Sequence, residues 1–213
     1  MSDVLKKEDL RQVFVAMIFA LAIGEFAITG YDVYEAYEVF NTSPYASLGH
    51  LCVALCIIIS SWVFWSQSFD NPSHPKFEQS PFSSYALLIV DIIIVVWYFI
   101  LVKTIDEGDP SSLPEIRILI WIFALFLLWQ AIISLHQWSG LSTFFKEICL
   151  DLCFMVIFII LYFCPIELIE KSLHDTEIVP AVIGIDACLC FLIIWYRVLQ
   201  NKSIAKKSKT RIN

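Results

Sequence analysis

Four carboxylic acids lie inside strongly apolar stretches of this chain: Glu25, Asp91, Asp151 and Asp186. An ionised side chain at the centre of a bilayer costs about 2.5–3.5 kcal/mol on insertion scales, so such residues usually face a protein interior, a partner or water. A buried acid avoids this cost by taking up a proton, by accepting hydrogen bonds or by binding a cation. These acids are therefore candidates for handling protons or monovalent cations.

The first apolar stretch extends this pattern around Glu25. Thr29 and Asp32 follow it at positions i+4 and i+7, so the three side chains share one face if the stretch is an α-helix. We interpret this face as a polar stripe and include all three residues in a candidate ion pathway.

A different face of the same stretch carries small side chains at every fourth position, namely Ala16, Ala20 and Gly24. A seam of small residues lets helices approach closely in lipid, where association depends on van der Waals packing. The seam predicts a helix-packing surface and favours a homo-oligomer.

The depth of each acid follows from the rise of about 1.5 Å per helical residue. Glu25 and Asp186 are expected near the bilayer midplane, whereas Asp91 and Asp151 share a level nearer the inner side. No lysine or arginine is expected deep enough to neutralise them. The simplest expectation is two layers of paired acids that share protons. The alternative is a structural role, with each acid bonded to a hydroxyl or carbonyl of a neighbouring helix.

The histidines and serines do not form a catalytic set. His50 and His136 are expected near opposite ends of the membrane, too far apart to share a metal or a haem. No Gly-x-Ser-x-Gly motif, His-Glu-x-x-His motif or phosphate-binding glycine loop occurs in the sequence. We expect no enzyme activity, no cofactor and no metal site.

The composition indicates which elements hold these residues. Hydrophobic residues are 59% of the 213 residues and charged residues only 16%, whereas a soluble domain has roughly 45–50% apolar residues. A membrane-spanning helix needs about 20 mostly apolar residues. Six segments are candidates: Gln12–Val33, Leu48–Ser66, Ser84–Val102, Ile116–Leu135, Ile148–Pro165 and Ile178–Leu199. The expected fold is an all-α bundle of six transmembrane helices, with no separate soluble domain.

Prolines mark several expected boundaries. The connector between the second and third segments is rich in proline and serine and is expected to be a loop. Pro165 is expected to end the fifth segment, and Pro180 to lie in the first turn of the sixth, where proline is tolerated.

The distribution of basic residues predicts the orientation. Only Lys103, Arg117 and Lys171 of the 14 basic residues lie in connectors on the side opposite the termini. Because cytoplasmic connectors carry the excess of lysine and arginine, both termini are expected in the cytoplasm. The domains are then a cytoplasmic N-terminus at 1–11, a transmembrane domain at 12–199 and a basic cytoplasmic tail at 200–213.

The opposite connectors are acidic. Their acidic residues are Glu35, Glu38, Asp106, Glu107, Asp109, Glu115, Glu167, Glu170, Asp175 and Glu177. A concentration of one charge at an entrance raises the local concentration of the opposite ion, which is one interpretation of this side. The other is that solvated loops on this side simply exclude basic residues.

Two functions follow from these features. The first is an oligomeric channel or transporter for protons or monovalent cations in the plasma membrane (the inner membrane of a bacterium). The second is a membrane anchor or effector subunit that moves no ion and binds a soluble cytoplasmic partner, for example in stress or defence. Lipid is the expected environment in both cases, and nucleic acid is not an expected partner.

Overall fold

The structure is a computed structural model. It describes the backbone of residues 2–40, 45–69, 81–107, 114–137, 141–172 and 175–212. Side chains are described within these ranges for residues 12–38, 45–67, 82–105, 115–133, 148–163 and 180–200.

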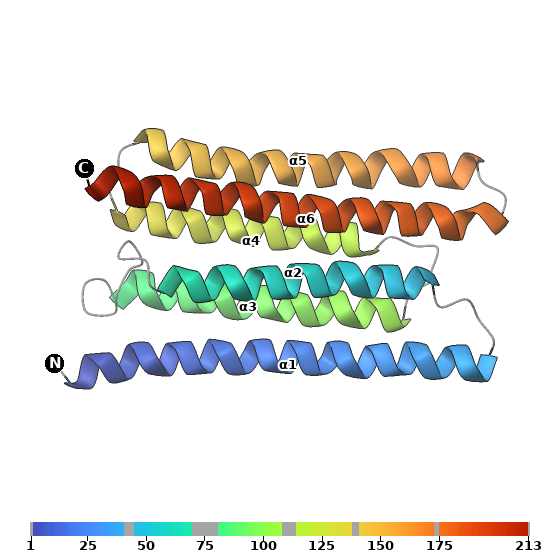
Figure 1. Cartoon of the computed structure of the whole chain (residues 1–213), viewed down its shortest axis with the longest axis horizontal. Helices are drawn as coiled ribbons and strands as arrows, with labels where there is room; N and C mark the ends of the chain where they lie inside the picture. Colours follow the sequence, from blue (N-terminus) through green and yellow to red (C-terminus); the bar gives the residue numbers. More distant parts are fainter. Residues whose placement is uncertain are drawn as a thin grey trace.

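All of the described backbone is α-helical, which confirms the expected fold class. The helices are α1 (Ser2–Phe40), α2 (Tyr45–Phe69), α3 (Pro81–Glu107), α4 (Pro114–Gln137), α5 (Leu141–Ser172) and α6 (Asp175–Ile212). They lie side by side with roughly parallel axes, and the start of α1 and the end of α6 are at the same end of the bundle (Figure 1).

Five helices contain described segments long and apolar enough to cross a membrane. These segments are Gln12–Glu38, Tyr45–Gln67, Phe82–Ile105, Glu115–Ile133 and Pro180–Gln200. The described apolar part of α5, Ile148–Phe163, is shorter. In hydrocarbon every backbone N–H and C=O must be bonded within the protein, and an α-helix does this without a neighbour. The segments therefore indicate a multi-pass membrane protein.

Helix α2 has the most neighbours in the bundle. It contacts α1, α3, α4 and α6, whereas α3 contacts α1, α2 and α4, and α4 contacts α2, α3 and α5. Within the described residues α1 contacts only α2 and α3, and α5 contacts only α4 and α6. Side chains from α2, α4 and α6 can therefore meet inside the bundle.

Aromatic side chains fill the interior where α4, α5 and α6 meet. The ring centroid of Phe123 lies 4.9 Å from that of Phe158 and 4.8 Å from that of Tyr196, and all three side chains are fully buried. Phe154 adds an edge-on contact to Tyr196 at 5.2 Å. Such pairs prefer tilted and edge-to-face geometries, so they fix the side chains in position as well as excluding lipid and water.

Several helices extend beyond their expected bounds. Helix α5 continues past Pro165 to Ser172, so the expectation that this proline ends the helix was wrong. Proline removes one backbone hydrogen bond inside a helix, but the rest of the apolar helix has no other way to satisfy its backbone in lipid. Helix α6 begins at Asp175, which places Pro180 beyond its first turn.

The polar ends of the chain are continuous with the first and last spans. Helix α1 includes most of the expected N-terminal segment, and α6 continues through most of the expected tail. The side chains of 1–11 and 201–213, and all of 70–80, lie outside the described residues. The orientation expected from their charges therefore remains a prediction.

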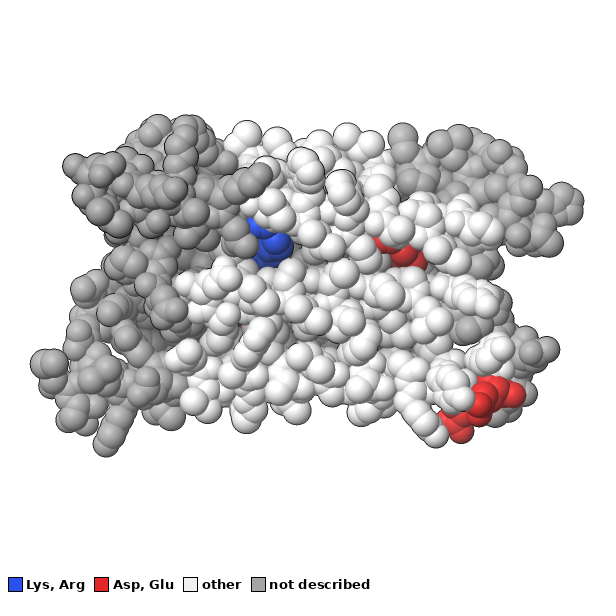
Figure 2. All heavy atoms as spheres, in the orientation of Figure 1, with Lys and Arg blue, Asp and Glu red and all other residues white. Residues whose placement is uncertain are grey.

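The described part of the face seen in Figure 2 is mostly uncharged. In Figure 2 one basic and one acidic patch lie apart in the seam between α6 and α2, and a second acidic patch lies at the end of α1. An uncharged belt is typical of a surface in contact with lipid.

The aromatic cluster gives the first test of the fold. Replacing Phe123 with alanine leaves a cavity beside Tyr196 and Phe158, and we expect a loss of about 3–5 kcal/mol of stability. The matched control is Phe191→Ala, because Phe191 is 60% exposed on the outside of α6. Thermal unfolding in detergent measures both variants. Equal losses in the two variants would contradict the packing described here.

Candidate cation-binding site

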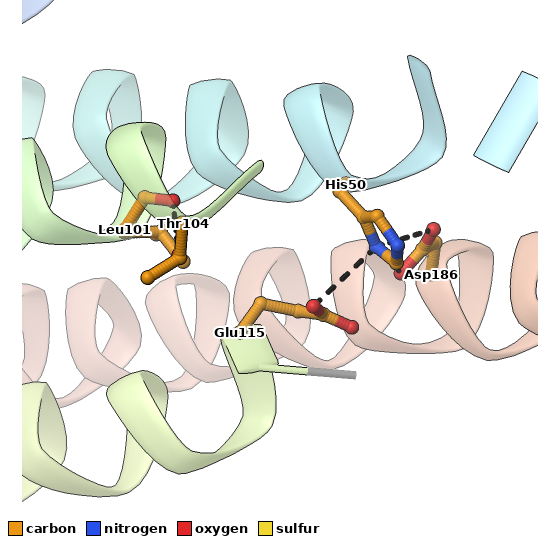
Figure 3. Close-up of polar contacts among 5 residues, drawn as sticks. All are labelled: His50, Leu101, Thr104, Glu115 and Asp186. Atoms are coloured by element: carbon orange, nitrogen blue, oxygen red, sulfur yellow. Dashed lines mark hydrogen bonds and ion pairs between the residues drawn. The ribbon is translucent and has the colours of Figure 1, made fainter. Parts of the chain in front are cut away.

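Three ionisable side chains from three helices meet inside the bundle. His50 of α2 points toward Glu115 of α4 and Asp186 of α6 (Figure 3). The His50 Nδ1 atom lies 3.2 Å from Asp186 Oδ2 and 3.4 Å from Glu115 Oε2. Each residue offers one ligand atom within 4.8 Å of the other two, and all three residues are buried. We call this group the His–Glu–Asp cluster.

Each member of the cluster is placed by a local feature of its helix. Pro114 is the first residue of α4, a position that proline favours because its fixed φ is helical and its missing N–H is not needed. Glu115 follows in the first turn, where the helix dipole stabilises a negative charge. Gly49 makes room for Asp186, because a Cβ atom at position 49 would collide with the Asp186 carboxylate.

His50 Nδ1 and Asp186 Oδ1 form a hydrogen bond of 3.3 Å, but other polar atoms of the cluster have none. His50 Nε2, both Glu115 oxygens and Asp186 Oδ2 are buried and have no hydrogen-bond partner among the described residues. The side chains of His50, Glu115 and Asp186 are only 4%, 0% and 2% exposed. Unpaired polar atoms in an apolar interior cost about 1–3 kcal/mol each, and more when they are charged. The cluster is therefore suited to hold a positively charged species.

A second polar region lies further along α2 and α6 and centres on Arg197. Its Nη2 donates to Ser61 Oγ at 2.6 Å and its Nη1 to Gln200 Oε1 at 2.8 Å. The Gln200 amide donates in turn to the Tyr196 hydroxyl at 3.2 Å, and that hydroxyl donates to Asp151 Oδ1 at 2.7 Å. The chain of hydrogen bonds thus links the guanidinium group to a carboxylate on α5.

Aromatic rings and a small cavity surround Arg197. Its Cζ atom lies 4.8 Å from the centroid of Phe126 and 5.0 Å from that of Phe64, which is the range of a cation–π contact. A cavity of about 40 Å³ beside it is also lined by Asp91 and Gln200. A water needs roughly 10–15 Å³ on this measure, so the cavity has room for a few water molecules.

The structure places Asp91 and Asp151 apart. Asp91 on α3 accepts a hydrogen bond from Trp129 Nε1 at 3.1 Å, whereas Asp151 on α5 accepts one from Tyr196. Helices α3 and α5 do not contact each other within the described residues. The expected inner layer of paired acids is therefore wrong, because aromatic N–H and O–H donors take the place of a second acid.

The expected pairing of Glu25 with Asp186 near the midplane is also wrong, because each acid has a different partner. Glu25 Oε1 forms an ion pair with Lys103 Nζ of α3 at 2.9 Å, although no basic residue was expected to reach this acid. A lysine near a helix end can extend its long stem along an apolar surface and so carry its charge inward. Asp186 instead belongs to the His–Glu–Asp cluster.

The other candidate residues of α1 divide into a group that is at least half-buried in the bundle and a group that is mostly exposed. Thr29 is fully buried and Asp32 is half-buried, so the polar stripe lies toward the bundle on this side of α1. Ala16 is half-buried, but Ala20 and Gly24 are exposed. The small-residue seam is therefore left largely uncovered by the described part of the chain.

Sequence reasoning missed His50 and Glu115 as members of one site. The sequence suggests only a comparison of His50 with His136, whose side chain lies outside the described residues, and it places Glu115 among the acidic residues of the connectors. One signal could have joined them: both lie at the ends of their helices that were expected on the same side of the membrane. Their contact with Asp186 depends on how three helices pack, which no spacing in the sequence records.

Comparisons of this chain with protein-family models, with curated proteins and with solved structures found no match. Its function must therefore be inferred from the residues described above.

The hydrogen-bond chain at Arg197 gives a second test. Tyr196→Phe removes the hydroxyl that donates to Asp151, and a hydrogen bond to a charged group contributes about 1.5–3 kcal/mol. We expect a loss of stability of that size in thermal or denaturant unfolding. Tyr45→Phe is the matched control, because Tyr45 is 63% exposed. If the two variants unfold alike, the Tyr196 bond does not support the bundle.

Proposed function

We propose that the protein is a membrane transporter that carries a proton or another cation, with the His–Glu–Asp cluster as its binding site. The observation that supports this most is the set of buried carboxylates that face one imidazole inside an apolar bundle, with oxygen atoms that have no hydrogen-bond partner among the described residues. A bundle that only needed to be stable would gain by replacing such groups with apolar side chains of similar volume. Ionisable residues within membrane spans are functional candidates for the same reason.

A carrier fits the arrangement better than an open channel. Between the cluster and the Arg197 region, the α2–α6 interface contains Val53, Ile57, Leu189 and Ile193, all of them fully buried. A cation crosses this apolar stretch only if α2 and α6 separate or slide. Movement of one packed part of the protein against another around a binding site is the basis of alternating access.

The protein acts in the plasma membrane with both termini in the cytoplasm, as its basic residues predict. It acts without an enzymatic step. It forms a homo-oligomer through the small-residue face of α1, because Ala20 and Gly24 lie exposed where a second helix could approach.

Reconstitution in liposomes tests the transport function. A pH-sensitive dye and ion-selective indicators measure the flux driven by an imposed gradient. Asp186→Asn keeps the shape of the side chain but removes its negative charge, so we expect the flux to fall at least about tenfold, equivalent to about 1.4 kcal/mol. Glu38→Gln is the matched control, since Glu38 is an exposed acid on α1.

Flux that is the same in wild-type protein, Asp186→Asn and Glu38→Gln would show that the cluster takes no part in transport. No flux of any cation in the wild-type protein would overturn the transport proposal and favour a membrane anchor that binds a soluble partner.

A further inference from the structure

We propose that the His–Glu–Asp cluster is a binding site for a divalent transition-metal ion of the Zn²⁺ class. The metal site rests on the proposed function in one respect, because both assign a bound cation to the same cluster. It goes beyond that function because a metal site can exist whether or not the protein transports anything.

The distances within the cluster match those around a single metal ion. Zinc binds histidine nitrogen and carboxylate oxygen at about 2.0–2.2 Å, which separates neighbouring tetrahedral ligand atoms by about 3.3–3.6 Å. His50 Nδ1 lies 3.2 Å from Asp186 Oδ2 and 3.4 Å from Glu115 Oε2. The two carboxylates have to approach by about 1.2–1.5 Å at most to complete the spacing, since all three ligand atoms lie within 4.8 Å.

The charge of the cluster also suits a divalent ion. When His50 is neutral, as a metal ligand must be, the two carboxylates carry two negative charges in an interior that excludes water. An uncompensated buried charge costs several kcal/mol after relaxation. One divalent cation compensates both charges at once and uses the oxygen atoms that have no hydrogen-bond partner.

The donor types favour transition metals over magnesium and calcium. Ca²⁺ takes six to eight oxygen ligands and Mg²⁺ prefers an octahedron of oxygen atoms, whereas the cluster supplies one nitrogen and two carboxylates. Imidazole nitrogen suits zinc, iron and nickel, and mixed nitrogen and oxygen sites also take manganese or cobalt. Three protein ligands leave a fourth tetrahedral position open, so the ion can bind and leave more readily than from a closed structural site.

Gly49 acts as a positioning residue for this site. The atoms nearest to a Cβ built at position 49 are those of the Asp186 side chain, with Cγ at 3.2 Å and an oxygen atom closer still. Gly49→Ala therefore forces the Asp186 carboxylate out of its present position while every ligand stays present. Groups that orient a metal ligand typically change affinity by 10–100-fold when they are altered.

The test uses the full chain, without a histidine tag, in lipid nanodiscs. Co²⁺ serves as the probe because it takes the place of zinc and absorbs visible light when it is tetrahedral. We expect one Co²⁺ per chain, visible bands that Zn²⁺ abolishes by competition, and no thiolate charge-transfer band. The last result separates the cluster from the free cysteines of α2, α5 and α6.

Four variants complete the experiment. His50→Ala, Glu115→Gln and Asp186→Asn should each weaken Co²⁺ binding at least about tenfold, and Gly49→Ala should do so by about 10–100-fold. Glu25→Gln is the matched control and should bind Co²⁺ like the wild-type protein, because it removes an acid paired with Lys103 outside the cluster. Circular dichroism identifies variants that fail to fold. If the three ligand variants fail to fold, Co²⁺ binding by Gly49→Ala and the visible spectrum of the wild-type protein with Co²⁺ decide the outcome.

The results distinguish the metal site from transport. Absence of Co²⁺ binding, or binding that is the same in the wild-type protein and in every folded variant of His50, Glu115, Asp186 and Gly49, overturns the metal site. Flux in liposomes then still supports transport of another cation. Co²⁺ binding that depends on the cluster supports the metal site even when no flux is observed, and in that case only the transport proposal fails.

Discussion

The absence of water from hydrocarbon is the constraint on which this structure depends. It forces the apolar segments into helices, because only a helix satisfies its own backbone without neighbours. It also forces polar side chains within the spans to find partners inside the bundle. The ion pair of Glu25 with Lys103, the Trp129 bond to Asp91 and the Tyr196 bond to Asp151 are each a response to this constraint.

Helix α6 carries the main parts of both polar regions. Asp186 contributes to the His–Glu–Asp cluster, and Tyr196, Arg197 and Gln200 form the hydrogen-bond chain that reaches α5. The two regions differ in the surroundings of their charges. The Arg197 guanidinium donates two hydrogen bonds and lies against aromatic rings, although its Nε has no hydrogen-bond partner among the described residues, and this arrangement suits a structural anchor. The cluster brings two buried carboxylates to one imidazole, with oxygen atoms that likewise lack a hydrogen-bond partner among these residues, which suits a ligand.

The close approach of α2 to α6 links these regions mechanically. Gly49 allows the Asp186 carboxylate to come close to α2, and Ser61 bonds Arg197 further along the same interface. In the proposed transport, a movement of α6 relative to α2 would change both regions together, because packed interfaces shift between discrete arrangements more readily than they deform.

The sequence by itself determined the all-α fold and the number of its helices, because apolar length and backbone satisfaction depend only on local composition. It also identified Asp186 as a buried acid. It did not identify the partners of Glu25, Asp91 and Asp151. It also gave no indication that His50 and Glu115 belong to one site. Those contacts depend on the rotation and offset of helices that lie far apart in the chain. Only the tertiary structure decided them, because side-chain contacts across helices follow from packing and leave no periodic signal in the sequence.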